Sequence, residues 1–252
     1  MNYRWDWAVF YDISADGTST YLQNMFAGMG WTIATAIVST ILALAIGVVV
    51  GLMRVSQSRS IRALGAAYVE VFRDIPLLVQ MFVWFFVVPE LLPSAIGTWI
   101  KGLTYGPFIT AALSLGLYAA ARVAEQTRAA IQALPNGQLM AALALGLKRS
   151  TAFHTVILPQ ALRIIVPPLT SEIVNIVKNT SLGMTIGMME LTARAREMQE
   201  SSFHTFEAFL AATAGYLAIN LVIISVMRLS ERRLGKSKKP APIAILNQEV
   251  LS

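Results

Sequence analysis

Four residues able to bind a charged molecule lie inside long apolar stretches of this sequence. Arg122 follows twenty uncharged residues, and further along the chain lie Glu172, Asn175 and Lys178. A guanidinium can clamp a carboxylate with two parallel hydrogen bonds. Because a charge at membrane depth costs about 3 kcal/mol on insertion scales, such residues are functional candidates by default. The predicted chemistry is therefore the binding of a small charged molecule, with a carboxylate as the natural partner of Arg122.

Arg122 also has simpler interpretations. Glu125 and Gln126 follow it by three and four residues, so on a helix they share its face and a local pair forms easily. The long side chain can also extend to the membrane surface. Glu172 and Lys178 are six residues apart, so they lie on different faces of a helix and each can meet another span or a second subunit. The sequence alone leaves these interpretations open.

The elements that must position these residues are helices that cross a membrane. The 252 residues are 56% hydrophobic and 13% charged, with a mean hydropathy of +0.60, which is more apolar than the roughly 45–50% typical of soluble chains. A helix needs about 20 largely apolar residues to cross a hydrocarbon core of about 30 Å. Runs of this length predict an all-α membrane bundle of about five transmembrane helices, at residues 28–53, 63–88, 102–121, 164–189 and 208–227.

Two of the five predicted spans are irregular. The second holds Glu70, Arg73 and Asp74 ahead of its uncharged part, and we expect a span with a polar entrance. The fourth contains Gly183 and Gly187, and we expect a broken or bent helix there. Irregular backbone at membrane depth is tolerated where protein or a water-filled path surrounds it.

Positive charge predicts the direction of the chain. Thirteen Lys and Arg residues lie in segments 54–62 and 126–163 and in the C-terminal part, whereas four lie on the opposite side. The positive-inside rule then places the N-terminus outside and the C-terminus in the cytoplasm. We expect residues 1–27 to form an external lead-in, 28–235 the transmembrane domain, and 236–252 a disordered cytoplasmic tail. Orientation and anionic membrane lipid explain the basic residues without nucleic acid.

Composition and motifs argue against several other classes. The chain has no Cys and two isolated His residues, so neither a thiolate nucleophile nor a metal site is expected. The His-Glu-x-x-His motif is absent, and the stretch most similar to a phosphate-binding loop, residues 230–237, lacks the first Gly of that motif. No catalytic residue is therefore predicted, and any ATP hydrolysis is expected to reside on another polypeptide.

The predicted cytoplasmic segment 135–159 has its own pattern. It begins with the turn-forming sequence Pro-Asn-Gly and continues as a short helix that Gly146 can end in the left-handed conformation. Ser150 or Thr151 can cap a second short helix, and Pro159 suits the first turn of the following span.

The first short helix has an unusually apolar surface. Ala141, Ala142 and Ala144 lie among Leu and Met residues, where charged residues would normally keep a surface helix soluble. A small apolar knob can insert into a groove of a partner protein. The alternative is that the helix packs on the chain's own spans or in the lipid interface.

This segment and several further motifs resemble one family of membrane proteins. Residues 141–159 read Ala-Ala-x3-Gly-x9-Val-Ile-Leu-Pro, which is similar to the Glu-Ala-Ala-x3-Gly-x9-Ile-x-Leu-Pro loop of ATP-binding-cassette importer permeases. The resemblance covers about residues 20–235 and is strongest to the polar amino acid branch, in particular to glutamate and aspartate permeases. It rests on Glu70-Val-Phe-Arg-Asp-Ile-Pro-Leu-Leu-Val-Gln80, Ala120-Ala-Arg-Val-Ala-Glu-Gln126, Pro167-Pro-Leu-Thr-Ser-Glu172 and Lys178-Asn-Thr-Ser-Leu182.

The resemblance implies a fold, partners and a cellular location. The fold would be that of a type I importer permease in a bacterial inner membrane. The partners would be a cytoplasmic ATPase that binds the ATP, a second permease subunit that is a different chain, and an external amino acid binding protein. Met140 stands where the family has Glu, so a salt bridge from that Glu is not carried over. The docking of the ATPase would fall to Ala141, Ala142, Gly146, Leu147 and Pro159.

The function implied is the import of a polar, acidic amino acid, glutamate or aspartate, or alternatively glutamine or asparagine. The substrate-binding candidates are then Arg122, Glu172, Asn175 and Lys178. The family usually has an aromatic or apolar residue at the position of Arg122. A stand-alone secondary transporter or channel subunit is the alternative, although five spans without an inverted repeat are few for a complete transporter.

Overall fold

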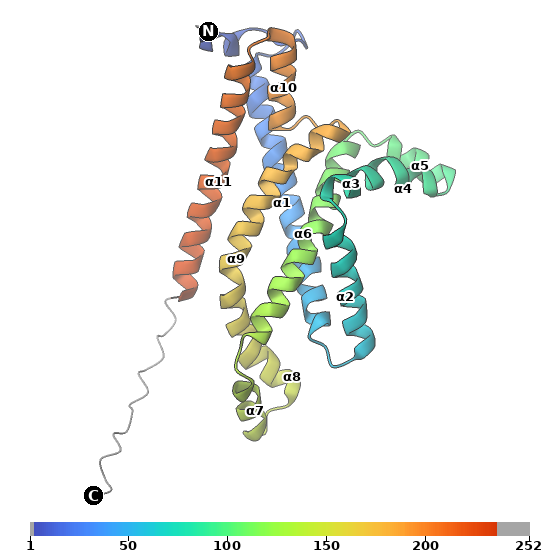
Figure 1. Ribbon diagram of the computed structural model, residues 1–252, viewed down its shortest axis with the longest axis vertical. Coiled ribbons are helices and arrows are strands. Elements are labelled where there is room, and N and C mark those ends of the chain that lie inside the picture. The colour runs from blue at the N-terminus through green and yellow to red at the C-terminus, as the bar shows by residue number, and fades with distance from the viewer. Residues whose placement is uncertain (1–2, 236–252) are drawn as a thin grey trace, which may run out of the picture.

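The structure is an elongated bundle of long helices with short helical segments at both ends (Figure 1). The computed structural model describes residues 3–235, so the predicted tail 236–252 lies outside the described residues. That part of the chain contains no strand and only an isolated bridge between Ile13 and Thr20. In chain order its elements are η1 (Trp7–Tyr11), α1 (Tyr21–Arg54), α2 (Arg59–Asp74), α3 (Leu77–Phe82), η2 (Val83–Val87), α4 (Val88–Leu91), α5 (Ser94–Lys101), α6 (Gly106–Gln132), α7 (Asn136–Ala144), α8 (Arg149–Ala152), η3 (Phe153–Ile157), α9 (Leu158–Asn179), η4 (Thr180–Ile186), α10 (Leu191–Ser202) and α11 (Thr205–Gly235).

Four helical runs are long and apolar enough to cross a membrane, and they correspond to four of the predicted spans. They are α1, α6, α11 and the run Arg149–Ile186, which joins α8, η3, α9 and η4. The helix α1 begins at Tyr21, so its first two turns fall within residues 1–27, which were predicted as an external lead-in. Thr20 caps this helix: the Gln23 backbone N–H donates to the Thr20 hydroxyl, and the Thr20 backbone N–H donates to the Gln23 side-chain oxygen.

The second predicted span, over 63–88, is bent between its charged and its uncharged part. The helix α2 meets the run Leu77–Leu91 at an angle of 99°. Pro76 has no N–H to donate and disfavours helix at Ile75, which is extended. The amide of Gln80 donates to the carbonyl oxygens of Phe72 and Ile75, at 2.9 and 2.8 Å, and so satisfies acceptors that the end of α2 leaves open.

The helices α1 and α6 cross at very close range. A Cβ atom placed on Gly47 would lie 2.6 Å from the Cβ of Val123, and one on Gly51 would lie 2.5 Å from the Cβ of Thr127. Glycine is therefore required at the crossing, because only a missing side chain lets the two backbones approach this closely. The hydroxyl of Ser39 on α1 also donates to the carbonyl oxygen of Ala112 on α6, at 3.1 Å.

Two π-helical turns each precede a proline inside a helical run. The turn η2 comes before Pro89, and η3 comes before Pro159. Proline cannot donate the usual hydrogen bond and its ring crowds the preceding turn. One extra residue in that turn absorbs the misfit, and the helix continues.

The fourth predicted span is interrupted at its end, as expected. After Asn179 the chain tightens into the 3-10 helix η4, which stops at Gly187 with a left-handed φ of 87°. Glycine adopts this conformation without strain. The interruption turns the chain toward α10, which lies beside the upper part of α1 (Figure 1).

The N-terminal segment is hydrogen-bonded to the first turn of α11. The carboxylate of Glu207 is fully buried and accepts hydrogen bonds from the Tyr3 hydroxyl and, at 2.9 Å, from the Asp6 backbone N–H. Val9 and Phe10 pack into a core with residues of α1, α10 and α11. This end of the bundle lies opposite the end that carries α7 and α8 (Figure 1).

Candidate functional site

Arg122 lies on α6 and faces α9. Its Nη1 is 3.5 Å from Oε2 of Glu172, and the guanidinium carbon is 5.5 Å from the ring centroid of Tyr118. Of the two side chains in the ion pair, that of Arg122 is 41% exposed and that of Glu172 only 6%. Tyr118, one turn before Arg122, was not singled out from the sequence, because tyrosine is ordinary in a membrane helix. The structure thus pairs two of the four predicted substrate-binding residues.

The pairing of Arg122 with Glu125, which the sequence left open, does not occur in the described chain. Glu125 instead accepts from Arg54, at the end of α1, and from Nη2 of Arg128 at 2.8 Å. Among the described residues the contact with Glu172 is the only ion pair of Arg122. A guanidinium has five N–H donors, so most of its hydrogen-bonding capacity is unused.

The position of Arg122 follows from the small residues around it. Ala119, Ala120, Ala121 and Ala124 are fully or almost fully buried, which lets α1 and α9 approach α6 on two sides. Arg122 is the long side chain within this run, and it emerges beside the seam between α6 and α9. The site therefore combines a buried carboxylate with a half-exposed guanidinium, an arrangement able to bind a zwitterion.

Asn175 and Lys178 lie on a different face of α9. They line a cavity of about 460 Å³ between α9 and α11, together with Thr170, Ser171, Arg228 and Glu231. The hydroxyl of Thr170 donates to Oε1 of Glu231 at 3.1 Å. The predicted residues thus form two sets: Arg122 of α6 with Glu172 of α9, and Asn175 with Lys178 farther around α9. Arg228 was missed from the sequence because it was counted among the basic residues that set membrane orientation, and Glu231 was not singled out.

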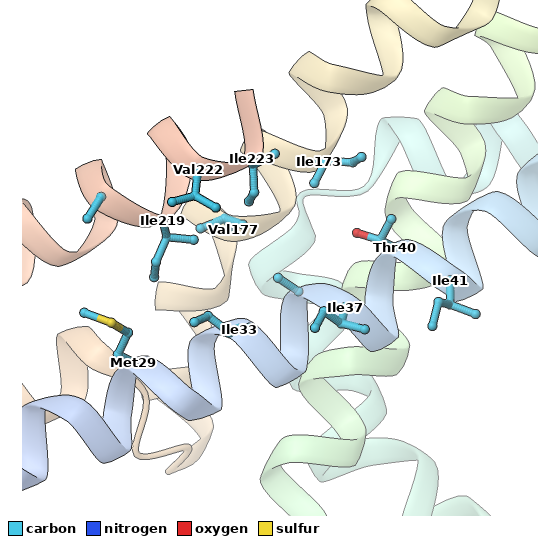
Figure 2. Close-up of a pocket in the computed structure, with 12 residues that line it drawn as sticks. Met29, Ile33, Ile37, Thr40, Ile41, Ile173, Val177, Ile219, Val222 and Ile223 are labelled. Atoms are coloured by element: carbon cyan, nitrogen blue, oxygen red, sulfur yellow. The ribbon is translucent and has the colours of Figure 1, made fainter. Parts of the chain in front are cut away.

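An apolar groove lies between α1, α9 and α11. The groove, of about 510 Å³, is lined by residues of these helices, among them Ile33, Ile37, Val177 and Val222 (Figure 2). Thr40 is the one polar side chain on it, and its hydroxyl has no hydrogen-bond partner in the described structure. A charged solute would lose its hydration there without compensation, so this groove is not a candidate path for one.

The predicted cytoplasmic segment 135–159, called the coupling segment below, begins with a capped helix that has an apolar outer surface. Gly146 has a left-handed φ of 83°. Its N–H donates to the Leu143 carbonyl at 2.9 Å, and that of Leu147 donates to the Ala142 carbonyl at 3.2 Å, which is a Schellman cap. Met140, Leu145 and Leu147 are exposed by 65%, 83% and 38%. The predicted left-handed cap at Gly146 is confirmed.

Other details of this segment differ from the expectation. Ser150 and Thr151 do not cap α8; the residue before α8 is Lys148, which makes no side-chain cap. The helix α8 runs through η3 into α9, so Pro159 lies in the first turn of α9 but inside a longer helical run. Ala142 is 5% exposed and packs inward, whereas Ala141 is exposed. Packing on the chain's own spans therefore accounts for Ala142 and leaves the neighbouring apolar side chains uncovered.

The fold and the site define a class: a helical membrane protein with charged residues at the helix seams and an exposed, rigidly capped apolar segment at one end. The model of a family described as "Binding-protein-dependent transport system inner membrane component" matches residues 43–236. The chain belongs to this family and is a multi-pass inner-membrane permease subunit of an ATP-binding-cassette importer.

Individual relatives agree with the family. The chain is similar to "Glutamate/aspartate import permease protein GltJ" of Escherichia coli strain K12, with 44% identity over 238 residues, covering 93% of this chain and 96% of the relative. A crystal structure of an amino acid ABC transporter with histidines matches with a TM-score of 0.73 and 29% identity, covering 84% of this chain and 95% of the other. The permease of an inward-facing MetNI methionine ABC transporter matches with a TM-score of 0.71, 21% identity and coverages of 84% and 97%, and supports the type I fold alone.

Proposed function

We propose that this chain forms one half of the membrane pathway of an importer for acidic amino acids, glutamate and aspartate, with glutamine and asparagine as weaker candidates. The observation that carries the proposal is the open guanidinium of Arg122 beside the buried carboxylate of Glu172. Arg122 would bind a substrate carboxylate and Glu172 the α-ammonium group. The similarity to a glutamate/aspartate permease supports the same substrate class.

The proposal assigns the energy source and the selecting step to partners. A cytoplasmic ATPase binds the ATP, so this chain needs no cofactor of its own, and it docks on Ala141, Ala142, Gly146, Leu147 and Pro159. An external binding protein delivers the amino acid, and a second, different permease subunit completes the pathway. The exposed apolar side chains around the Schellman cap support the docking surface. The N-terminus lies outside and the C-terminus in the cytoplasm, as the distribution of Lys and Arg indicates.

Substrate binding at Arg122 is tested by Arg122→Ala and Arg122→Lys in the reconstituted complex. Uptake of radiolabelled glutamate is compared with uptake of glutamine. Loss of a charge-assisted hydrogen bond predicts a decrease of about 10- to 100-fold in glutamate uptake efficiency for Ala, with a smaller effect on glutamine. Lys keeps the charge without the planar fork and should give an intermediate value. Glutamate uptake at the wild-type level in Arg122→Ala would rule out the clamp.

Docking of the ATPase is tested at Gly146, where no atom outside the local backbone lies within 4 Å of an added Cβ. Gly146→Arg projects a bulky charge from the apolar surface and should abolish co-purification of the ATPase. Gly146→Asn is the matched control, because Asn tolerates the left-handed conformation and is small. Retained co-purification with Arg would contradict the docking surface. Uptake by the chain alone, driven by an ion gradient, would instead favour a secondary transporter.

A further inference from the structure

The cavity between α9 and α11 is a polar hollow inside an otherwise apolar pair of helices. On α9 its walls come from one stripe of residues spaced by three and four, which includes Thr170, Ser171, Asn175 and Lys178. On α11 they come from Ile224, Arg228 and Glu231, again on one face. Its volume of about 460 Å³ lies within the range of about 300–1,000 Å³ typical of small-molecule sites.

The charges of this cavity leave a positive excess. Lys178 and Arg228 both line it and are exposed, and neither forms an ion pair within 4.0 Å with any described residue. Glu231 is the carboxylate in the cavity, and its Oε1 is already engaged by the Thr170 hydroxyl. A lysine in a membrane span is unfavourable by about 3 kcal/mol if it faces lipid. Lys178 is therefore placed to face water or an anion.

This cavity adjoins the proposed substrate site around the circumference of α9. Glu172 faces α6 and contacts Arg122, whereas Lys178 follows it by six residues and lines the cavity toward α11. Successive residues of a helix are rotated by about 100°, so Asn175 lies between the two faces.

We propose that the α9–α11 cavity is a second carboxylate-binding site, in which Lys178 and Arg228 hold an acidic amino acid, with Asn175 and Ser171 as hydrogen-bonding partners. The proposal rests on the proposed function, because it takes the same ligand. The shared chemistry is that of a small anion, so the phosphate of an anionic lipid is the competing occupant.

The experiment measures equilibrium binding of radiolabelled glutamate to the complex in nanodiscs of zwitterionic lipid. The variants are Lys178→Gln and Arg228→Gln, with Arg232→Gln as the matched control, since Arg232 is exposed on the same helix and does not line the cavity. We expect two binding phases in the wild type and in Arg232→Gln. Each cavity variant should weaken one phase about tenfold, as loss of one charged hydrogen bond predicts. Lys178→Arg should retain that phase.

The outcomes separate this inference from the proposed function. If Lys178→Gln and Arg228→Gln bind glutamate as Arg232→Gln does, the second site is ruled out, even where Arg122→Ala still abolishes the other phase. If Arg122→Ala changes neither phase while the cavity variants weaken one, the second site stands and the Arg122 site fails. The last comparison repeats the binding measurement in nanodiscs with added anionic lipid. If glutamate binds with one phase in both lipids, and Arg228→Gln lowers only the binding of anionic lipid, the cavity is a lipid site and the proposal is overturned.

Discussion

Two charged clusters lie one turn apart on α6 and differ in how fully their charges are paired. Glu125 accepts from Arg54 of α1 and from Nε and Nη2 of Arg128, at 3.0 and 2.8 Å for the latter. Arg128 in turn donates to the side chain of Gln132 at 2.5 Å. Arg122 has a single ion pair among the described residues, at 3.5 Å from Glu172.

The difference indicates which cluster holds the fold and which can bind a ligand. The hydrogen-bonding capacity of Glu125 is largely used, and its partners tie the ends of α1 and α6 together just before the coupling segment. The contact of Arg122 is longer than the 2.7–2.9 Å or so of a strong charge-assisted bond, and one cation faces one carboxylate. A ligand can bind Arg122 by forming hydrogen bonds with its unused donors, whereas it could bind at Glu125 only by breaking existing hydrogen bonds.

The largest effect is expected from separating α1 and α6. In Gly51→Ala the new Cβ would lie 2.5 Å from the Cβ of Thr127, so the helices must move apart beside the Glu125 cluster. Overpacking of this kind destabilises by about 1–3 kcal/mol. The thermal unfolding midpoint of the purified complex measures it. Gly30→Ala is the control, because nothing lies within 4 Å of its Cβ, and an unchanged midpoint in both variants would show that the crossing is not tight.

Glu172→Gln should affect binding more than stability. The amide can still accept a hydrogen bond from Arg122, so the midpoint should change little, whereas the anchor for a substrate ammonium is lost. Glutamate affinity should decrease about tenfold, the effect of one charged hydrogen bond. Glutarate, which has no ammonium group, should bind equally to both proteins. An equal decrease for glutarate would assign Glu172 to positioning Arg122 instead.

Glu125→Gln should show the reverse pattern. It leaves Arg54 and Arg128 facing each other without a carboxylate, in a site where the side chains are 20–31% exposed. A partly exposed network of this kind contributes about 1 kcal/mol. The unfolding midpoint should fall slightly and become less dependent on salt, with glutamate affinity unchanged. A tenfold loss of affinity would contradict the distinction between the two clusters.

The smallest effect on stability is expected at Asp16, a carboxylate outside the spans that accepts several hydrogen bonds. Hydrogen bonds from the Ser19 hydroxyl and from the backbone N–H groups of Thr18 and Ser19 hold the pKa of Asp16 well below its usual value. Because the pKa is lowered on folding, the stabilisation is present above the unfolded value of about 4 and is lost as the pH falls toward the folded value. The difference in unfolding midpoint between wild type and Asp16→Asn should therefore shrink below about pH 4. A difference that grows as the pH falls would reverse the sign.

The coupling segment shows which local features can be predicted from the sequence and which cannot. Gly146 was predicted as a left-handed cap because only the local backbone decides that conformation, and it is one. Ser150 and Thr151 were predicted as caps by the same reasoning and are not, because α8 starts at Arg149 as part of a run that continues into α9. The bend at Pro76 was not predicted within the expected span with a polar entrance. The hydrogen bonds of Gln80 that accompany the bend depend on where its amide lies once the chain has turned.

By itself, the sequence determined the helical class, the approximate spans, the cap at Gly146 and the four polar residues at membrane depth. Each of these depends on local quantities, namely the length of apolar runs, the conformational freedom of glycine and the position of charges along the chain. Only the tertiary structure decided that Arg122 pairs with Glu172 rather than Glu125, and that Lys178 shares a cavity with Arg228. Those pairings depend on how α6, α9 and α11 pack, and spacing along one helix carries no information about the neighbour it will meet.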